Sequence, residues 1–358
     1  MIQTLHADSA RRSDAIAIAR VICILGVVYV HAWTGLNGEA LTALRHTPQE
    51  GFRWVLMEVF GHSAVPLLGL ISGWLVGGSA RTRDWMRHMS RKTKTILLPM
   101  VLWNGLAILL VSGAAIFGTL SAPQPHSASW VFQELFIVSR NPDINVQMPF
   151  LRDLFLCMML APLLVRLPGW ALGLIAAIAV ICQIAGIGPP LFMRPAILFF
   201  FTAGILARRH GAAELAAGLA WPVAALPFAL LMVAHLALSL YTPASGVGMA
   251  GLDMAVRITA AVFFWRLAWA LADSPARGAL LRIEPFAFML FCAHLILIWL
   301  GGPLLGTLFG RLGTPLYPAY LIVQPLLALL AVILFGTLLT RLSPRLARIL
   351  SGGRLKPA

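Results

Sequence analysis

Charged residues are scarce in this chain, and long polar stretches are absent. Of its 358 residues, 59% are hydrophobic and only 11% are charged, whereas a soluble domain carries about 25% charged residues. A large soluble domain therefore fits nowhere in the sequence. Apolar runs recur along the whole length. We therefore expect an all-α, polytopic transmembrane helix bundle that forms a single domain over residues 1–358.

Cysteine is also rare, and the spacings that build common catalytic or metal centres are missing. The four cysteines all fall in apolar runs, where free cysteine ordinarily behaves as a small buried hydrophobe. The chain has no His-x-x-x-His or Cys-x-x-Cys spacing for a metal ion and no Gly-x-Ser-x-Gly elbow for a nucleophilic serine. It also lacks the P-loop, so ATP hydrolysis is not expected. Histidine acid/base chemistry, polar packing and ion translocation remain as roles for the polar residues.

The apolar runs predict about ten helices, each near the roughly 20 residues needed to cross the hydrocarbon core. Short cytoplasmic segments at about 1–13 and 343–358 flank them. We find no internal repeat and no low-complexity segment. The predicted helices lie at about 14–34, 52–77, 94–118, 149–166, 169–187, 193–209, 215–240, 249–272, 284–303 and 316–342.

Basic residues outnumber acidic ones by 27 to 13, which gives a net charge of +14. The positions of the basic residues explain this excess better than a nucleic-acid partner, which we do not expect. With the N-terminus inside, eighteen of the 27 Lys and Arg residues fall in inner segments and five in outer segments. Cytoplasmic loops carry the excess of Lys and Arg. The asymmetry therefore predicts both termini in the cytoplasm, an even number of spans, and contact with anionic membrane lipid.

Two ionisable residues, Arg20 and His31, interrupt the first apolar run. An ionisable residue within a membrane-spanning helix is costly, so it marks a functional site by default. Eleven residues make about three helical turns. Both side chains therefore project from nearly the same face, roughly 16 Å apart along the axis. In the predicted orientation Arg20 lies toward the cytoplasmic side and His31 toward the outer side.

Further ionisable residues lie at membrane depth, most of them in the outer half of the predicted bundle. Such groups face a bundle interior or a water-filled cavity, because lipid does not tolerate them. Two of them, at positions 58 and 62, share a helix face and can pair. The charges at 152/153 and 253/257 can equally be salt bridges that fix packing, and a lone histidine can simply hydrogen-bond across helices. The outer set comprises His31, Glu58, His62, Arg152, Asp153, Arg194, Asp253, Arg257 and His294, and Arg266 lies deeper.

Five segments occur in an order that is typical of one protein family. The first is Arg20 followed, after ten residues, by His31. The others are 65–75 with Ser72-Gly73, the basic loop 81–94 before Leu98-Pro99, 149–155 with 161–164, and 286–294. Together they cover nearly the whole chain and resemble the acyltransferase-3 family of integral membrane acyltransferases. The run before Ser72 is aliphatic where the family is aromatic, and residues 150–153 replace a Trp-aromatic-Leu. These departures bear on acceptor specificity more than on the chemistry.

The resemblance implies a stand-alone enzyme of a bacterial inner membrane, without an appended extracytoplasmic domain. It implies transfer of an acyl group, acetyl or succinyl, from cytoplasmic acyl-CoA to a hydroxyl of an envelope glycan or lipid-linked saccharide. Acyl-CoA is then a cosubstrate, and no permanently bound cofactor is expected. Basic side chains on the cytoplasmic side would hold the CoA phosphates as charge-assisted pairs, although lipid contact alone can also explain the cluster at 81–94. These side chains are Arg20, Arg81, Arg83, Arg87, Arg91, Lys92 and Arg266.

His31 is the predicted general base toward the acceptor hydroxyl, because an imidazole titrates near neutrality. Glu58 is the first candidate to orient its ring, and Asp153 is the alternative. His294 is expected to position substrate or to help release the proton. The group that stabilises the oxyanion is not visible in the sequence. The predicted substrate-binding side chains are His62, Ser72, Arg152, Arg194, Asp253 and Arg257.

Two other classes of function stay open on the sequence alone. A secondary transporter, or a flippase of a glycan, lipid or small solute, would use intramembrane His, Glu and Asp as a proton relay. Such transporters often contain repeats with paired broken helices, and we detect none in the sequence. A structural membrane partner would not need Arg20 and His31 on one face. The sequence leaves the acyl group, the acceptor, the molecule that crosses the bilayer and the oligomeric state undetermined.

Overall fold

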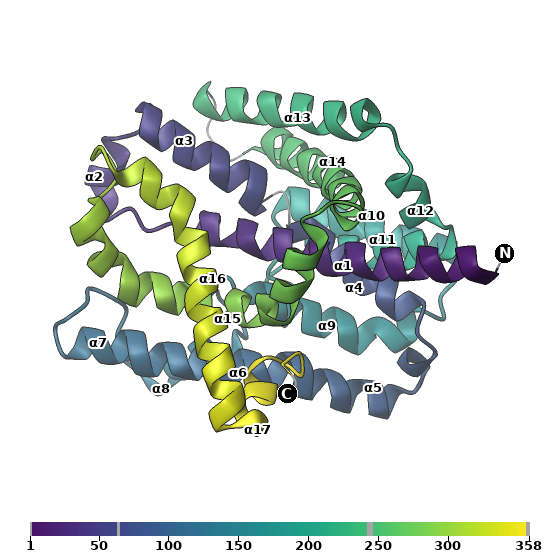
Figure 1. Cartoon of the computed structure of the whole chain (residues 1–358), viewed down its shortest axis with the longest axis horizontal. Coiled ribbons are helices and arrows are strands. Elements are labelled where there is room, and N and C mark those ends of the chain that lie inside the picture. The colour runs from purple at the N-terminus through teal and green to yellow at the C-terminus, as the bar shows by residue number, and fades with distance from the viewer. Residues whose placement is uncertain (1, 63–64, 242–245, 356–358) are drawn as a thin grey trace. The chain divides into compact units, whose positions relative to one another are not determined.

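All of the regular structure is helical in the part of the chain that is described (Figure 1). The computed structural model describes residues 2–62, 65–241 and 246–355, and within these ranges it contains no strand. The predicted all-α class is thereby confirmed. The longest helices are α1 (Ile2–Val30), α13 (Trp221–Tyr241), α14 (Val247–Ala272), α15 (Arg277–Phe309) and α16 (Tyr317–Leu342).

Among the described residues, seven helical stretches are long and apolar enough to cross a membrane, judged by length and composition alone. They lie at Ser9–Val30, Pro48–Gly77, Trp85–Ile116, Trp221–Ser239, Val247–Ala272, Arg277–Phe309 and Tyr317–Leu342. The three other predicted helices correspond to α9 (Pro149–Leu164), α10 (Gly169–Ala185) and α11 (Ala196–Arg209), of 16, 17 and 14 residues. These are about 21–26 Å long, shorter than the roughly 30 Å hydrocarbon core. The chain is a multi-pass integral membrane protein, and the count of ten spans stays a prediction.

Two of the predicted helices change pitch along their length. The segment predicted at 52–77 consists of α3 (Pro48–Leu56), the π-helix η1 (Met57–His62) and α4 (Val65–Gly77). Hydropathy does not register a π-helical turn, because the turn keeps the same apolar side chains and changes only the hydrogen-bond pattern. The segment predicted at 94–118 continues from α5 (Trp85–Lys92) through η3 (Thr93–Leu97), α6 (Leu98–Ala107), η4 (Ile108–Ser112) and α7 (Gly113–Ile116).

Several short helices in the connections are not predicted from the sequence. One of them, α12 (Ala212–Ala217), overlaps the start of the helix predicted at 215–240 but is a separate helix that ends before α13 begins. Gly218 forms its C-cap, and Pro222 lies in the first turn of α13, where a proline removes no helical hydrogen bond. The others are α2 (Gly38–Thr42), η2 (Ala80–Arg83), α8 (Ala128–Phe136) and α17 (Pro344–Leu350).

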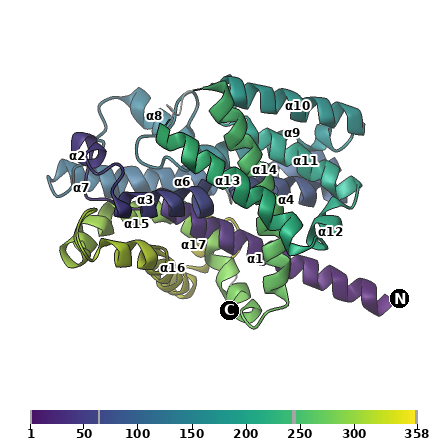
Figure 2. The ribbon, with the colours of Figure 1, turned by 90° about the horizontal axis from the view of Figure 1, so that it is seen from above.

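The contacts group the chain into two compact units. The first unit contains Met1–Cys23, Ser63–Thr93 and Phe150–Glu284, and the second contains Ile24–His62, Lys94–Pro149 and Pro285–Ala358. In the first unit, α4 and α11 lie side by side in both views (Figure 1, Figure 2). A Cβ atom added to Gly73 would overlap the Phe201 carbonyl oxygen, and one added to Gly204 would overlap that of Leu70. Small residues let helices approach this closely, so the Ser72-Gly73 pair belongs to a packing contact.

In the second unit, the part of α1 from Ile24 onward packs against η1. A Cβ atom added to Gly26 would overlap the Phe60 carbonyl oxygen, and one added to Gly61 would overlap the Val30 side chain. The two glycines therefore allow the backbones of α1 and η1 to touch. The last turns of α1 and the π-helical segment form one contiguous contact.

Candidate active site

His31 lies in the turn that follows the last helical residue of α1. Its backbone N–H donates to the Val28 carbonyl oxygen at 3.3 Å. Helix α16 holds both ends of this turn: the Gln324 amide nitrogen donates to the same Val28 oxygen at 3.4 Å, and Gln324 Oε1 accepts the Trp33 backbone N–H at 3.2 Å. The Tyr317 hydroxyl donates to the Trp33 carbonyl oxygen at 2.9 Å. Neither Gln324 nor Tyr317 is among the site residues predicted from the sequence, although a lone amide within an apolar run is a usable signal.

His294 of α15 brings a second imidazole next to His31, with the ring centroids 5.4 Å apart. Its side chain is fully buried. Its Nδ1 lies 2.8 Å from the Phe291 carbonyl oxygen and 3.2 Å from that of Leu290, and because carbonyl oxygens only accept, Nδ1 carries the proton. Nε2 therefore holds the lone pair, and it has no hydrogen-bond partner among the described residues. A buried acceptor of this kind suits a ligand that donates a hydrogen bond.

Glu58 and His62 form the pair that their spacing predicts, with His62 Nδ1 3.1 Å from Glu58 Oε1. The Glu58 side chain is 13% exposed and that of His62 is 37% exposed. Both lie on η1, and π-helical turns are frequent at functional sites. The carboxylate is engaged by His62, and its predicted role of orienting His31 stays a prediction.

Arg152, Asp153 and Arg194 come together in a hydrogen-bond network of the first unit, around the buried Asp153 carboxylate. The fully buried Asp153 carboxylate accepts an N–H of the Arg152 guanidinium at 2.7 Å and the Arg194 backbone N–H at 2.7 Å. Arg152 also donates to the carbonyl oxygens of residues 190 and 191 at 2.6 and 2.7 Å. These contacts fasten the segment before α11 to α9. They favour the packing role that the sequence left open for Asp153.

The charged residues of α14 are also engaged in contacts within the first unit. Asp253 Oδ2 accepts the Arg257 Nε–H at 2.7 Å, as their spacing predicts. Arg266 Nε donates to the Leu219 carbonyl oxygen at 2.9 Å, and its guanidinium lies 4.6 Å above the Trp221 ring. Arg266 therefore anchors the start of α13, and its contacts give no support to the predicted role in phosphate binding.

Arg20 pairs with Glu284, whose Oε1 lies 3.0 Å from Arg20 Nη1. The Arg20 side chain is 34% exposed, and a guanidinium has five N–H donors, so this contact uses part of its capacity for anions. Glu284 is not among the site residues predicted from the sequence, because it lies 264 residues further along the chain. Ser72 is half-buried on α4 beside the packing residue Gly73, and its predicted substrate contact stays a prediction.

The basic cluster lies on η2 and α5 of the first unit. Asp84 caps α5 by accepting the Arg87 backbone N–H at 3.2 Å, and its carboxylate lies 3.4 Å from the Arg87 guanidinium. The Arg87 side chain is nevertheless 88% exposed. The cluster thus presents guanidinium groups to an anionic partner from solvent or from a lipid surface. Its exposed arginines are Arg81, Arg83, Arg87 and Arg91, and Lys92 is half-buried.

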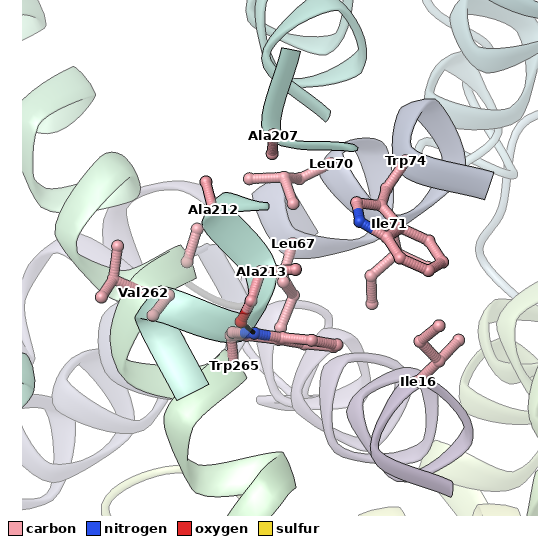
Figure 3. Close-up of a pocket in the computed structure, with 12 residues that line it drawn as sticks. Ile16, Leu67, Leu70, Ile71, Trp74, Ala207, Ala212, Ala213, Val262 and Trp265 are labelled. Carbon is pink, nitrogen blue, oxygen red and sulfur yellow. Dashed lines mark hydrogen bonds between the residues drawn. The ribbon is translucent and has the colours of Figure 1, made fainter. Parts of the chain in front are cut away.

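An apolar pocket of about 150 Å³ opens in the first unit (Figure 3). The Trp265 indole N–H donates to the Ala213 carbonyl oxygen at 2.8 Å across one of its walls. The guanidinium groups of Arg12 and Arg208 lie 5.2 and 4.1 Å from the centroid of the Trp74 ring. Among the described residues, the side chains that line the pocket are all apolar or tryptophan. It is lined by Ile16, Leu67, Leu70, Ile71, Trp74, Ala207, Ala212, Ala213, Ala216, Ala261, Val262 and Trp265.

Comparison with known proteins identifies the class to which this helical membrane protein belongs. Residues 13–341 match a family model described as an acyltransferase domain. The chain therefore belongs to the acyltransferase-3 family, as the order of its motifs predicts, and is a membrane acyltransferase. Among its relatives is the succinoglycan biosynthesis protein ExoH of Rhizobium meliloti (strain 1021), 29% identical over 367 residues that cover 96% of this chain and 93% of that protein. No solved structure matches.

Proposed function

We propose that this protein transfers an acyl group from cytoplasmic acyl-CoA to a hydroxyl of an envelope glycan or lipid-linked saccharide, with His31 as general base. The observation that carries the proposal is the pair of adjacent imidazoles, the half-buried His31 and the buried His294, in a chain of the acyltransferase-3 family. The name of the relative, a succinoglycan biosynthesis protein, supports a glycan as the acceptor. A multi-pass enzyme of a bacterial inner membrane fits this reaction.

In the proposed reaction, His31 accepts the proton of the acceptor hydroxyl as its oxygen attacks the thioester carbonyl carbon. The carbonyl oxygen becomes an oxyanion, and the carbon–sulfur bond then breaks. The CoA thiolate leaves and takes the proton back from the His31 imidazolium, so that an ester and free CoA form. General-base help of this kind contributes about 10²- to 10⁴-fold to the rate.

His294 supports the same step through its unprotonated Nε2. That atom accepts a hydrogen bond from a hydroxyl and so holds the acceptor for attack, or it relays the proton on release. Its Nδ1–H is already committed to two backbone carbonyl oxygens, which fixes the tautomer. Nε2 is therefore the ring nitrogen of His294 that can accept a hydrogen bond or a proton.

On the donor side, cationic side chains of the first unit hold the CoA phosphates. Arg20 and the exposed arginines at 81, 83, 87 and 91 form charge-assisted hydrogen bonds with phosphate oxygens. Acyl-CoA is then a cosubstrate that binds and leaves in each turnover.

The test uses purified protein in detergent with labelled acetyl-CoA, labelled succinyl-CoA and glycan acceptors. The expected result is release of free CoA together with a labelled glycan, in a His31-dependent way. His31→Ala, expressed at the same level, should lose turnover. Wild-type acyl transfer by that variant would show that the base has been wrongly assigned. A transporter would instead show activity only in sealed vesicles.

A further inference from the structure

The turn that carries His31 is bracketed by two side chains of α16. Gln324 is 3% exposed and Tyr317 is fully buried. Gln324 donates to the Val28 carbonyl oxygen on one side of His31 and accepts the Trp33 N–H on the other. Its amide orientation follows from these partners, since only the nitrogen can face a carbonyl oxygen and only the oxygen can face an N–H.

Such bracketing matters because His31 stands just beyond the last helical residue of α1. The last turn of a helix leaves carbonyl oxygens without intrahelical partners, and at membrane depth there is no water to satisfy them. Gln324 gives the Val28 carbonyl oxygen, which already accepts the His31 N–H, a second donor, and it gives the Trp33 N–H an acceptor. It also ties the residues before and after His31 to one rigid helix.

Helix α15 completes the frame around this turn. The Trp33 ring fills the space over Gly302 and Gly306, where an added Cβ atom would overlap it. The same helix carries His294, whose ring lies 5.4 Å from that of His31. The residues that flank His31 are thus held by α16 on the backbone and by α15 through Trp33.

We propose that Gln324 is a positioning residue, which holds the turn at residues 28–33 so that the His31 imidazole stays beside His294. The inference rests on the proposed function, because it assumes that His31 is the base. Gln324 touches the backbone on both sides of His31 and acts through it. A residue that only stabilised the end of α1 would affect folding and not the rate of the chemical step.

The primary test replaces Gln324 by Met, which keeps the length of the side chain and removes both hydrogen bonds. A displacement of about 1 Å at a catalytic group can cost 10²-fold in rate. We therefore expect kcat to fall about 10- to 100-fold while KM for acyl-CoA stays unchanged. The matched control is Gln183→Met in the first unit, which removes a comparable contact between Gln183 Oε1 and the Ala196 N–H (3.0 Å). Its kcat should stay near that of the wild type.

Gln324→Glu adds a readout that a purely structural role would not move. A protonated carboxyl group donates and accepts as the amide does, whereas a carboxylate cannot donate to the Val28 oxygen. The kcat of Gln324→Glu relative to wild type should therefore rise as the pH falls, and the same ratio for Gln324→Met should stay flat. If kcat relative to wild type changed with pH in the same way for both variants, the proposal would be overturned. Tyr317→Phe, which removes one hydrogen bond and keeps the ring, should give a smaller loss of kcat and serves if Gln324→Met does not fold.

A double variant separates this proposal from the proposed function. If Gln324 acts through His31, then Gln324→Met should cause no further loss of the residual rate in a His31→Ala background. Multiplied losses would show that Gln324 acts elsewhere and would overturn the inference. Full activity of His31→Ala would instead refute the assignment of the base. An inactive His31→Ala together with wild-type kcat in Gln324→Met would refute the positioning role alone.

Discussion

The ion pair between Arg20 and Glu284 allows the donor-binding role of Arg20 to be separated from a packing role. Arg20→Gln removes the cation, whereas Glu284→Gln keeps the cation and removes the anion that competes for it. If Arg20 binds a CoA phosphate, the first variant weakens CoA binding and the second leaves it equal or tighter. If the pair only fixes packing, both variants lose the same contact and should behave alike.

The geometry sets the size of both effects. The two atoms are 3.0 Å apart and the side chains of Arg20 and Glu284 are 34% and 22% exposed, so the pair stabilises the fold by no more than about 1 kcal/mol. A hydrogen bond between charged partners such as guanidinium and phosphate contributes about 1.5–3 kcal/mol. Since about 1.4 kcal/mol corresponds to a factor of ten, Arg20→Gln should weaken CoA binding about 10- to 140-fold.

The assay is titration calorimetry of CoA with the purified protein in detergent, together with turnover at saturating labelled acetyl-CoA. His31→Ala is the matched control, and it should keep CoA binding while losing turnover. Equal loss of CoA affinity in Arg20→Gln and Glu284→Gln would refute a phosphate contact at Arg20. Equal loss in Arg20→Gln and His31→Ala would refute the division between a donor-binding residue and a base.

Three further predictions concern stability. Asp153→Ala should lower the free energy of unfolding by about 1–3 kcal/mol, because the Met193 and Arg194 backbone N–H groups lose their acceptor while Arg152 keeps two backbone carbonyl partners. Unchanged thermal unfolding with lost activity would instead support a substrate role. Gly73→Ala should reduce the yield and thermal stability of folded protein more than Ser72→Ala, since only the former meets the Phe201 carbonyl oxygen; similar losses would contradict this. Burial raises the pKa of the Glu134 carboxyl above its ordinary value, against two backbone hydrogen bonds that lower it. The stabilising contribution of Glu134 is thus complete below its unfolded pKa and is lost as the pH rises through the higher folded pKa. Between about pH 4 and about pH 8, the unfolding temperature of the wild type should fall relative to that of Glu134→Gln. A difference between the two proteins that stayed constant with pH would contradict the pKa shift.

Local pattern predicts the helices and the pairs that are close in sequence. Each apolar run contains a helix, because hydropathy is a property of the run itself. The contact of Glu58 with His62 follows from a spacing of four, and so does that of Asp253 with Arg257. The π-helical pitch of residues 57–62 does not follow, because the pattern of apolar side chains does not register a change in the backbone hydrogen bonds.

Partners that are distant in sequence escape such reasoning. Glu284 is 264 residues from Arg20, and the backbone that Gln324 binds near His31 is almost 300 residues away. A single sequence does not indicate which residues so far apart along the chain lie in contact. The Ser72-Gly73 motif shows a related gap, because the motif is visible in sequence while its packing against Phe201 is visible only in the structure.

The structure also provides a physical criterion for sorting the ionisable residues at membrane depth. A charge whose hydrogen-bonding capacity is met by backbone and by an opposite charge, as at Asp153, is accounted for by packing, and a ligand would have to displace those partners. His294 Nε2 is different, because it is buried and has no partner among the described residues. An unmet acceptor beside a second imidazole calls for a donor, and a hydroxyl is the donor that acyl transfer requires. If the acceptor hydroxyl donates to this atom, as we propose, its binding recovers the cost of leaving the atom unmet, about 1–3 kcal/mol, and directs binding energy to the reacting oxygen.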